Sequence, residues 1–336
     1  MRILVTGGAG FIGSHYVRTL LTGGYSGCRD ASVTVLDKLT YAGNLANLKS
    51  VAESPRFEFV KGDICDAPLL RSVLPGHDAV INFAAETHVD RSIAGAAEFA
   101  ATNVAGVQIL LEACLETKVP RVVQVSTDEV YGSVASGSWT EDTPLAPNSP
   151  YSAAKAGGDL MARAYARTHE LNVSITRCCN NYGPYQYPEK VIPLFVTNLM
   201  DGKPVPLYGD GLNVRGWIHV DDHCRGIQLV LEKGAPGRVY HINGDTELTN
   251  RELTAAILAA CGASWQMVVP VTDRKGHDRR YSLDDSLLRS MGYAPRIQFP
   301  DGLKATVAWY ADNRHWWEPL DRPAPPARPA DGGNES

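Results

Sequence analysis

Three side chains have types and spacing that suit the oxidation of an alcohol. Tyr151 and Lys155 stand four residues apart at the start of a predicted helix, so both lie on one face of it. A cation beside a phenol favours the phenolate, which can take the proton of an alcohol while a hydride leaves the adjacent carbon. Thr127 follows a predicted strand and can hydrogen-bond to the same oxygen. Together these three residues predict a redox site.

Two carboxyl groups directly follow this threonine and add an acid and a base. Once an alcohol has been oxidised, a base can remove the proton next to the ketone while an acid protonates a leaving hydroxyl, so Asp128 and Glu129 could expel water. Neighbouring carboxylates raise each other's pKa, which helps one of them stay protonated near neutral pH. On the residues alone, an Asp-Glu pair that merely caps the strand end or faces solvent remains the alternative.

Apolar runs alternate with helical patterns through the first half of the chain, which is typical of βαβ units and a parallel sheet. We expect strands at Arg2–Thr6, Ser32–Asp37, Phe57–Lys61, Ala79–Phe83, Arg121–Ser126 and Asn172–Arg177. We expect helices near Ile12–Leu21, Ala67–Leu74, Ala96–Thr117 and Tyr151–Glu170. A doubly wound sheet binds ligands at the carboxyl ends of its strands, where the residues above should therefore meet.

A glycine-rich turn joins the first strand to the first helix. Gly7, Gly10 and Gly13 form G-x-x-G-x-x-G, which lets a dinucleotide pyrophosphate approach the helix N-terminus and lets the helix pack closely on the sheet. Asp37 ends the second strand, where a carboxylate binds the ribose diol and repels the 2′-phosphate of NADP, so we predict NAD. A local capping role for Asp37 is the alternative. Asp63 and Ile64 could flank the adenine, although Asp63 is as well suited to cap a helix.

The composition of the sequence changes after residue 180, where proline, glycine and tyrosine become frequent. We predict an α/β fold: a doubly wound parallel Rossmann sheet with a smaller, interleaved substrate-binding lobe. The NAD-binding Rossmann domain should comprise residues 1–179 with a return segment at about 217–240. The substrate-binding lobe should comprise 180–216 and 241–320. Residues 322–336 contain too few apolar side chains to pack, and we expect a disordered tail.

The composition of the chain excludes some classes of binding partner. The 336 residues include 32 Lys and Arg against 37 Asp and Glu, a net charge of −5. A nucleic-acid or membrane-surface protein usually carries a basic stripe or patch, so we expect neither partner. The first strand begins at once, without a basic or long apolar leader, and the seven cysteines lack metal-type spacing. We therefore expect a cytoplasmic protein with reduced thiols and no bound metal.

Seven motifs stand in order from residue 7 to about residue 223: GGAGFIGS, DKLTYAGN, FAAETHVDRSI, STDEVYG, YSAAKA, RCCNNYGPYQYPEKVIP and LYGDGLNVRGWIHVDDH. Through them the chain resembles the extended short-chain dehydrogenase/reductases and, among these, the dTDP-glucose 4,6-dehydratases. The glycine and Tyr/Lys motifs mark only the superfamily, whereas STDEVYG with NNYGPYQYPEK is specific to the dehydratase branch and its nearest relatives. The resemblance implies a homodimer with tightly held NAD that acts on a nucleotide sugar, with dTDP-glucose as the expected substrate.

The resemblance also implies site residues. The positions that it places around NAD are Gly7, Gly10, Phe11, Ile12, Gly13, Asp37, Lys38, Leu39, Thr40, Asp63, Ile64, Phe83, Ala84, Ala85, Glu86, Thr87, Thr102, Tyr151, Lys155 and Asn181. The positions that it places around the nucleotide sugar are Thr87, Thr127, Asn180, Lys190, Val191, Pro206, Leu207, Tyr208, Arg215, Asn250, Arg274, Lys275, Gly276, His277 and Asp278. Among these, Lys190, Arg215 and Arg274 are the expected partners of the diphosphate.

With the chemistry above, the resemblance makes Tyr151 the base for the 4-hydroxyl, Glu129 the base at C5 and Asp128 the acid at the C6 hydroxyl. One position departs from the family pattern, because Gly216 stands where an aspartate is common. Two other functions stay open on the residues alone. A nucleotide-sugar 4-epimerase needs the Tyr/Lys pair but no pair of acids, and a non-catalytic NAD-binding regulator needs only the glycine turn. The residues do not distinguish dTDP from UDP, CDP or GDP.

Overall fold

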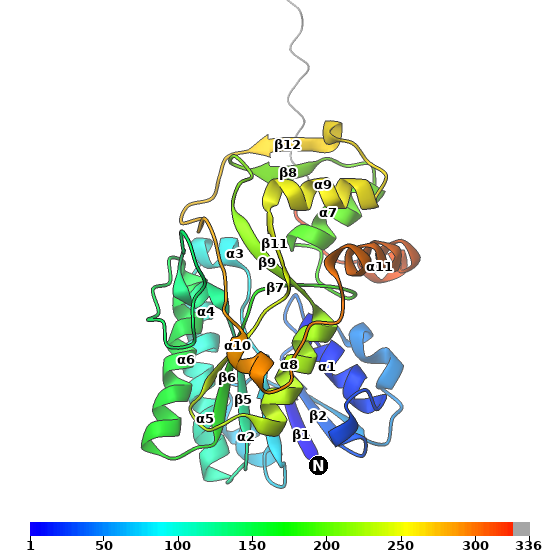
Figure 1. The fold of residues 1–336 in the computed structure, drawn as a ribbon. Coiled ribbons are helices and arrows are strands. Elements are labelled where there is room, and N and C mark those ends of the chain that lie inside the picture. Colours follow the sequence, from blue (N-terminus) through cyan, green and yellow to red (C-terminus); the bar gives the residue numbers. More distant parts are fainter. Residues whose placement is uncertain (325–336) are drawn as a thin grey trace, which may run out of the picture.

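Seven parallel strands form the main sheet of the computed structural model, which describes residues 1–324 (Figure 1). These strands are β1 (Arg2–Thr6), β2 (Ser32–Asp37), β3 (Phe57–Lys61), β4 (Ala79–Asn82), β5 (Val122–Thr127), β6 (Val173–Cys178) and β10 (Val239–Ile242). Their order in the sheet is β10-β6-β5-β4-β1-β2-β3. The chain therefore reverses direction across the sheet between β1 and β4, and this is the switch point where such a sheet binds ligands.

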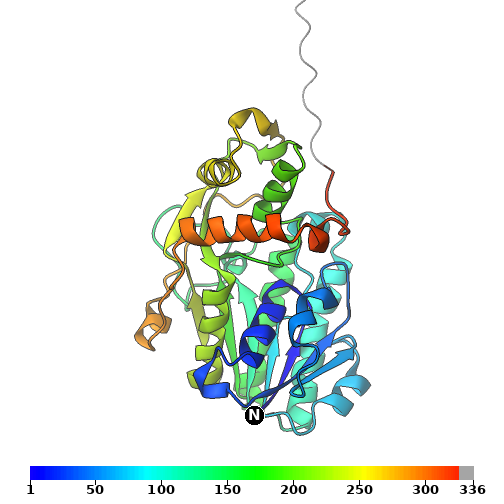
Figure 2. The same ribbon diagram turned by 90° about the vertical axis from the view of Figure 1, so that its right-hand side faces the viewer.

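Helices cover both faces of this sheet (Figures 1 and 2). One layer contains α1 (Phe11–Leu21) and α8 (Val220–Lys233), and the other contains α2 (Ala67–Val73), α5 (Val107–Glu116) and α6 (Pro150–Thr168). Because successive side chains of a strand point to opposite faces, Ile3 and Val5 pack in the first layer and Leu4 packs in the second. Every residue of β5 and β6 is buried, as expected of central strands covered on both sides. The α/β doubly wound prediction is confirmed.

A smaller lobe lies over the carboxyl edge of the sheet (Figure 1). It contains a three-stranded sheet of β7 (Asn180–Tyr182), β9 (Val214–His219) and β11 (Thr246–Thr249), and a parallel pair of β8 (Val205–Tyr208) and β12 (Val268–Val271). Its helices are α7 (Val191–Met200), α9 (Asn250–Ala260), α11 (Phe299–Asp312) and α12 (Arg314–Trp317). Buried aromatic side chains, among them Trp217, Tyr310 and Trp317, form its core.

Shorter elements connect these parts. They are α3 (Val89–Ala94), α4 (Ala97–Ala100), α10 (Ser286–Ser290) and 3-10 turns at Ser26–Cys28, Leu45–Val51, Asp128–Tyr131 and Trp265–Met267. The single helix expected over Ala96–Thr117 is interrupted by a π-helical turn at Ala101–Gly106. This turn directs Asn103 to both backbone polar groups of Glu86. Ala97–Glu116 has the length and hydropathy of a membrane span, but the apolar side chains of α5 pack inside the domain.

Several expected boundaries need correction. β5 and β6 begin and end one residue later than expected, so Thr127 is the last residue of its strand. The return segment extends past residue 240, since β10 ends at Ile242, and Leu288 and Tyr293 also pack in the core of the larger domain. The expected tail begins too early, because Arg322 binds Asp201 at 2.8 Å. The rest of the expected tail, 325–336, lies outside the described residues.

Candidate active site

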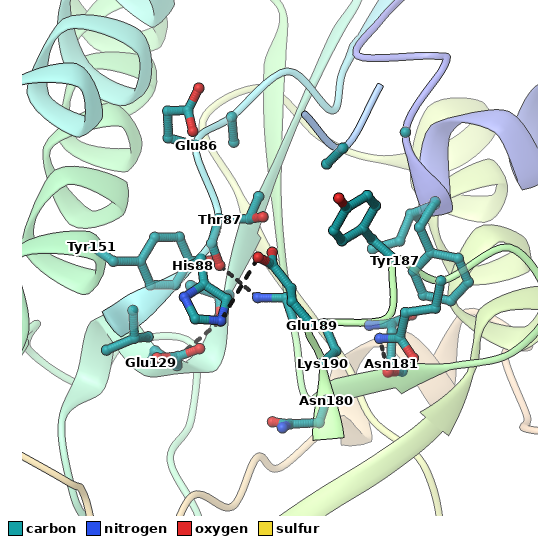
Figure 3. Close-up of a pocket in the computed structure, with 18 of the residues that line it drawn as sticks. Glu86, Thr87, His88, Glu129, Tyr151, Asn180, Asn181, Tyr187, Glu189 and Lys190 are labelled. Atoms are coloured by element: carbon teal, nitrogen blue, oxygen red, sulfur yellow. Dashed lines mark hydrogen bonds and ion pairs between the residues drawn. The ribbon is translucent and has the colours of Figure 1, made fainter. Parts of the chain in front are cut away.

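A cavity of about 480 Å³ lies between the carboxyl edge of the main sheet and the smaller lobe. On the side of the larger domain, its lining comes from the turns after β1, β2, β3, β4 and β5 and from α6. On the side of the smaller lobe, it comes from the chain between β6 and α7, from α7, β8, β9 and α9, and from the chain after β12. Figure 3 shows Tyr151 and Glu129 on one side of the cavity, with Glu189 and Lys190 facing them. The cavity is thus located where the order of the strands predicts a ligand.

The glycine turn leaves no room for side chains. Gly7 has a φ of +66°, and a Cβ on it would lie 2.6 Å from the backbone nitrogen of Ala84. A Cβ on Gly13 would lie 2.4 Å from the Gly7 carbonyl oxygen. Gly10 precedes α1 without any side-chain cap, so the first N–H groups of the helix are available to an anion. This cradle fits a dinucleotide pyrophosphate.

Gly13→Ala is expected to lower the free energy of unfolding by about 1–3 kcal/mol, since the added methyl overpacks a rigid turn. It should also release most of the dinucleotide that co-purifies with the wild type. Thermal melting and the nucleotide freed on denaturation measure the two effects. Gly95→Ala is the matched control, because a Cβ on Gly95 meets nothing within 4 Å. Equal nucleotide content in the two variants would contradict the role of the turn.

Asp37 is held by the backbone at the end of β2. Its carboxylate accepts hydrogen bonds from the N–H groups of Ala9 at 2.9 Å and Leu39 at 2.8 Å. Burial raises the pKa of Asp37, and these two donors oppose the effect. Since Asp37 also lines the cavity, its remaining lone pairs can accept from a ribose diol. The following residue, Lys38, forms an ion pair with Asp63, in which Nζ and Oδ2 lie 2.8 Å apart.

All but one of the residues expected around NAD line the cavity. Those that do are Gly7, Gly10, Phe11, Ile12, Gly13, Asp37, Lys38, Thr40, Asp63, Ile64, Phe83, Ala84, Ala85, Glu86, Thr87, Thr102, Tyr151, Lys155 and Asn181. Leu39 is the exception. Its backbone has a φ of 58°, and its side chain packs against the hydrophobic core of the larger domain. The motif DKLTYAGN placed Leu39 near NAD in the sequence but did not predict the direction of its side chain.

Tyr151 and Lys155 lie in the first turns of α6, as their spacing predicts. Lys155 Nζ donates a hydrogen bond to the carbonyl of Val125 at 2.7 Å. Burial raises the pKa of Tyr151 well above its usual value, the Glu129 carboxylate adds to this, and hydrogen bonding with Thr127 opposes it. Burial also lowers the pKa of Lys155. Burial and the nearby carboxylates therefore favour the neutral phenol over the expected phenolate.

The acid and the base differ in their surroundings. Thr127 Oγ1 donates to Asp128 Oδ1 at 3.2 Å, and Asp128 is only 1% exposed. Burial, together with the neighbouring Glu129, raises the pKa of Asp128 to about 8. Glu129 lines the cavity, whereas Asp128 is absent from the lining among the described residues. Burial raises the pKa of Glu129 as well, and nearby cations oppose this. One carboxyl group is thus exposed to a ligand and the other is held protonated behind it.

On the sugar side, most of the expected residues line the same cavity. They are Thr87, Thr127, Asn180, Lys190, Val191, Pro206, Leu207, Tyr208, Arg215, Asn250, Arg274 and His277. Lys275 and Gly276 do not, because both are exposed in the turn after β12. Asp278 also does not, since its carboxylate accepts from Asn148 Nδ2 at 2.6 Å and from Tyr281 Oη at 2.8 Å.

The three cations expected to hold a diphosphate converge on the cavity from separate elements. Lys190 Nζ donates to the carbonyl of Thr87 at 2.7 Å. The Arg215 guanidinium lies 4.0 Å from the centre of the Tyr281 ring and donates to the backbone. Arg274 is 3.9 Å from the Asp90 carboxylate. Each of the three opposes the rise in the pKa of Glu129, so their field reaches the reaction site.

Glu189 and Tyr281 are among the polar residues of the cavity wall that sequence reasoning missed. Glu189 is 7% exposed and accepts from Tyr41 Oη at 2.9 Å and Arg91 Nε at 3.3 Å. Glu189 directly precedes Lys190 in the motif RCCNNYGPYQYPEKVIP, and this position could have identified it as a site residue. Tyr281 lies in irregular chain beyond the motifs, so no local pattern pointed to it.

The position that departs from the family pattern is closely packed. A Cβ on Gly216 would lie 3.1 Å from Asn243 Oδ1 and 3.1 Å from the Cβ of Cys179. A larger side chain at this point in β9 would require its neighbours to shift. The seven cysteines are all unpaired, and burial raises the pKa of Cys178 to about 12, so this thiol stays protonated. Within residues 1–324, no cluster of metal-ligating side chains is found.

Known proteins share both the sequence and the fold. A family model described as GDP-mannose 4,6 dehydratase matches residues 4–306. A dTDP-glucose 4,6-dehydratase of Streptomyces niveus is 61% identical, with 96% of each chain covered. The crystal structure of a dTDP-glucose 4,6-dehydratase from Streptomyces venezuelae, with NAD bound, is 64% identical at a TM-score of 0.94, covering 96% of this chain and 100% of that chain.

A UDP-glucose 4-epimerase from Thermotoga maritima is more distant, at 31% identity and a TM-score of 0.85, with 94% of this chain and 100% of that chain covered. The fold is therefore shared by two reaction types, while the relatives that are 61% and 64% identical are both dehydratases. The resemblance inferred from the motifs is confirmed. The chain belongs to the dTDP-glucose 4,6-dehydratase family.

Proposed function

We propose that the chain is an NAD-dependent lyase that converts dTDP-glucose to dTDP-4-keto-6-deoxyglucose. The observation that carries the proposal is the arrangement of two sets of groups around one cavity. Tyr151 and Lys155 suit the oxidation of an alcohol, and the turn with Asp128 and Glu129 suits the elimination of water. Relatives 61% and 64% identical to the chain are named dTDP-glucose 4,6-dehydratases, and the solved one holds NAD.

In the first step the 4-hydroxyl loses its proton. Bound NAD would accept the hydride from C4 and later return it to C6, so no net oxidation of the sugar occurs. Tyr151 is the group that takes the hydroxyl proton, and Thr127 can hydrogen-bond to the same oxygen. Lys155 donates to the Val125 carbonyl of β5 and is the cation that the Tyr/Lys spacing places on the helix face of Tyr151.

In the second step water leaves across C5 and C6. The C5 proton lies next to the new ketone, so Glu129 at the cavity wall can remove it and give it back to C5 when C6 receives the hydride. Asp128, whose pKa is raised to about 8, holds the proton that the leaving hydroxyl requires. Lys190, Arg215 and Arg274 would hold the diphosphate and fix the sugar against both carboxyl groups.

A 4-epimerase is the second candidate, since one such enzyme shares this fold at a TM-score of 0.85. An epimerase has no use for an acid and a base at C5 and C6. The protonated, buried Asp128 beside a cavity-facing Glu129 therefore favours the dehydratase. A non-catalytic NAD-binding protein would need neither pair. The seven unpaired cysteines support action in the reducing cytoplasm.

The test is product analysis with the purified protein and no added cofactor. dTDP-, UDP-, CDP- and GDP-glucose are supplied separately, and products are identified by mass spectrometry and by alkali-sensitive absorbance. We expect loss of one water from dTDP-glucose and the release of one NAD per protomer on denaturation. Formation of a 4-epimer without loss of water would replace the proposal with the epimerase. A preference for another nucleotide would correct only the substrate.

A further inference from the structure

A row of buried polar side chains lies behind the turn that carries Asp128 and Glu129. Arg177 in β6 and Asp159 in α6 form an ion pair with Nε and Oδ2 2.9 Å apart, and both side chains are fully buried. Arg177 Nη1 also donates to the hydroxyl of Tyr131, and the guanidinium lies 4.8 Å from the ring. Tyr131 is the last residue of the turn, so the ion pair connects the turn to α6.

The row continues from Tyr131 to β10, and its protons can be assigned. His241 Nδ1 lies 2.8 Å from the Asp284 carbonyl, which can only accept, so Nδ1 carries the proton. Burial lowers the pKa of His241 to about 4, so the ring is neutral and Nε2 is an acceptor. The Tyr131 hydroxyl, 2.6 Å away, therefore donates to Nε2 while accepting from Arg177. Every group in the row has one consistent role.

The ion pair is a poor source of stability. Burying two charges costs several kcal/mol per ion, and apolar residues of similar size often stabilise a protein as well or better. Here Asp159 Oδ1 and Arg177 Nη2 have no hydrogen-bond partner within the described part of the chain. Asp159 lies four residues after Lys155 and eight after Tyr151 on the same helix. The row thus joins the two elements that carry the two halves of the proposed chemistry.

We propose that Tyr131 is a positioning residue for the elimination of water, an inference that rests on the proposed dehydratase function. It does not line the cavity formed by the described residues. Instead its hydroxyl fixes the turn Asp128–Tyr131 to α6 through Arg177 and to β10 through His241. Without it the turn can shift relative to α6, whereas Lys155 keeps its own bond to Val125. Loss of the hydroxyl should therefore disturb elimination more than oxidation.

Tyr131→Phe tests this, with Tyr182→Phe as the matched control. The Tyr182 hydroxyl is also buried but has no hydrogen-bond partner among the described residues. For Tyr131→Phe we expect kcat to fall about tenfold, since displacing a catalytic group by about 1 Å can cost about 100-fold. KM should change by less than about twofold, because substrate binding is untouched. NADH should accumulate during turnover and C5 deuterium exchange should slow, while single-turnover hydride transfer stays near the wild-type rate.

Two further variants keep the test decisive if Tyr131→Phe folds poorly. His241→Gln keeps an acceptor near the position of Nε2, whereas His241→Leu removes it, so only His241→Leu should accumulate NADH. Unchanged turnover in Tyr131→Phe, equal slowing of oxidation and elimination, or identical behaviour of the two His241 variants would overturn the proposal. A wild type that forms no 4-keto-6-deoxy sugar would instead overturn the proposed function, and the positioning role with it.

Discussion

Replacing Tyr151 with phenylalanine is expected to slow the oxidation at C4 by about 10²–10⁴-fold, the usual contribution of a general acid or base. The change removes only the hydroxyl that takes the proton of the substrate. The ring keeps its edge-on contact with Phe99, so the fold and the bound cofactor should be retained. Single-turnover formation of NADH, followed by absorbance after mixing with dTDP-glucose, measures this step directly.

Lys155→Ala should reduce the same step, because it removes both the nearby charge and the bond to the Val125 carbonyl. Tyr165→Phe is a suitable control on the same helix, since its hydroxyl binds Gln108 and Glu112 away from the cavity. It should form NADH at the wild-type rate. If Tyr151→Phe did the same, the proton of the 4-hydroxyl would have to go to another group.

Features encoded by neighbouring residues could be predicted from the sequence. The β-branched runs give the strands within about one residue, since burial on both faces of a parallel sheet requires continuous apolar sequence. The glycine turn could be predicted from its local spacing, and the structure adds the reason: a Cβ would lie 2.6 Å from Ala84 N at Gly7 and 2.4 Å from the Gly7 carbonyl oxygen at Gly13. Residues at the carboxyl ends of neighbouring strands, such as Thr127 and Thr87, line one cavity because these ends share one edge of the parallel sheet.

Features that depend on contacts between distant segments could not be predicted from the sequence. Asp278 stands in a polar run that suits a diphosphate site, yet its carboxylate binds Asn148, 130 residues away. Tyr281 reaches the cavity only because the chain after β12 crosses the larger domain. The row from Asp159 to His241 spans four elements and has no sequence period. The charge and spacing of Lys155 also did not predict that its ammonium would donate a hydrogen bond to a strand carbonyl.

Asp128→Asn and Glu129→Gln should separate elimination from oxidation. Each removes an acid or base and should lower overall turnover by about 10²–10⁴-fold, while C4 oxidation continues. Both variants should therefore hold the substrate as the 4-keto sugar, with NADH visible on the enzyme. Both changes preserve side-chain size, so bound NAD and thermal stability serve as controls.

The pH dependence of wild-type activity should reflect the ionisation of Asp128 and Glu129. Asp128 acts in its protonated form, which prevails below its pKa of about 8, so elimination should slow as the pH rises through that value. Glu129 acts in its ionised form, and burial raises its pKa, so activity should fall as acid protonates it. Asp128→Asn should lack the alkaline decline. A wild-type profile that stays flat well above pH 8 would contradict the role of Asp128 as the acid.

Deuterium labelling in heavy water then distinguishes the two carboxyl groups. Glu129 is the proposed base at C5, so Glu129→Gln should lose both C5 exchange and dehydration. In Asp128→Asn the base remains, and the C5 proton can leave and return many times while the hydroxyl lacks its proton. Exchange at C5 should therefore persist when loss of water has slowed, and mass spectrometry of recovered substrate would show it. Normal C5 labelling with normal dehydration in Glu129→Gln would remove Glu129 from the mechanism, because both steps would then proceed without its carboxylate.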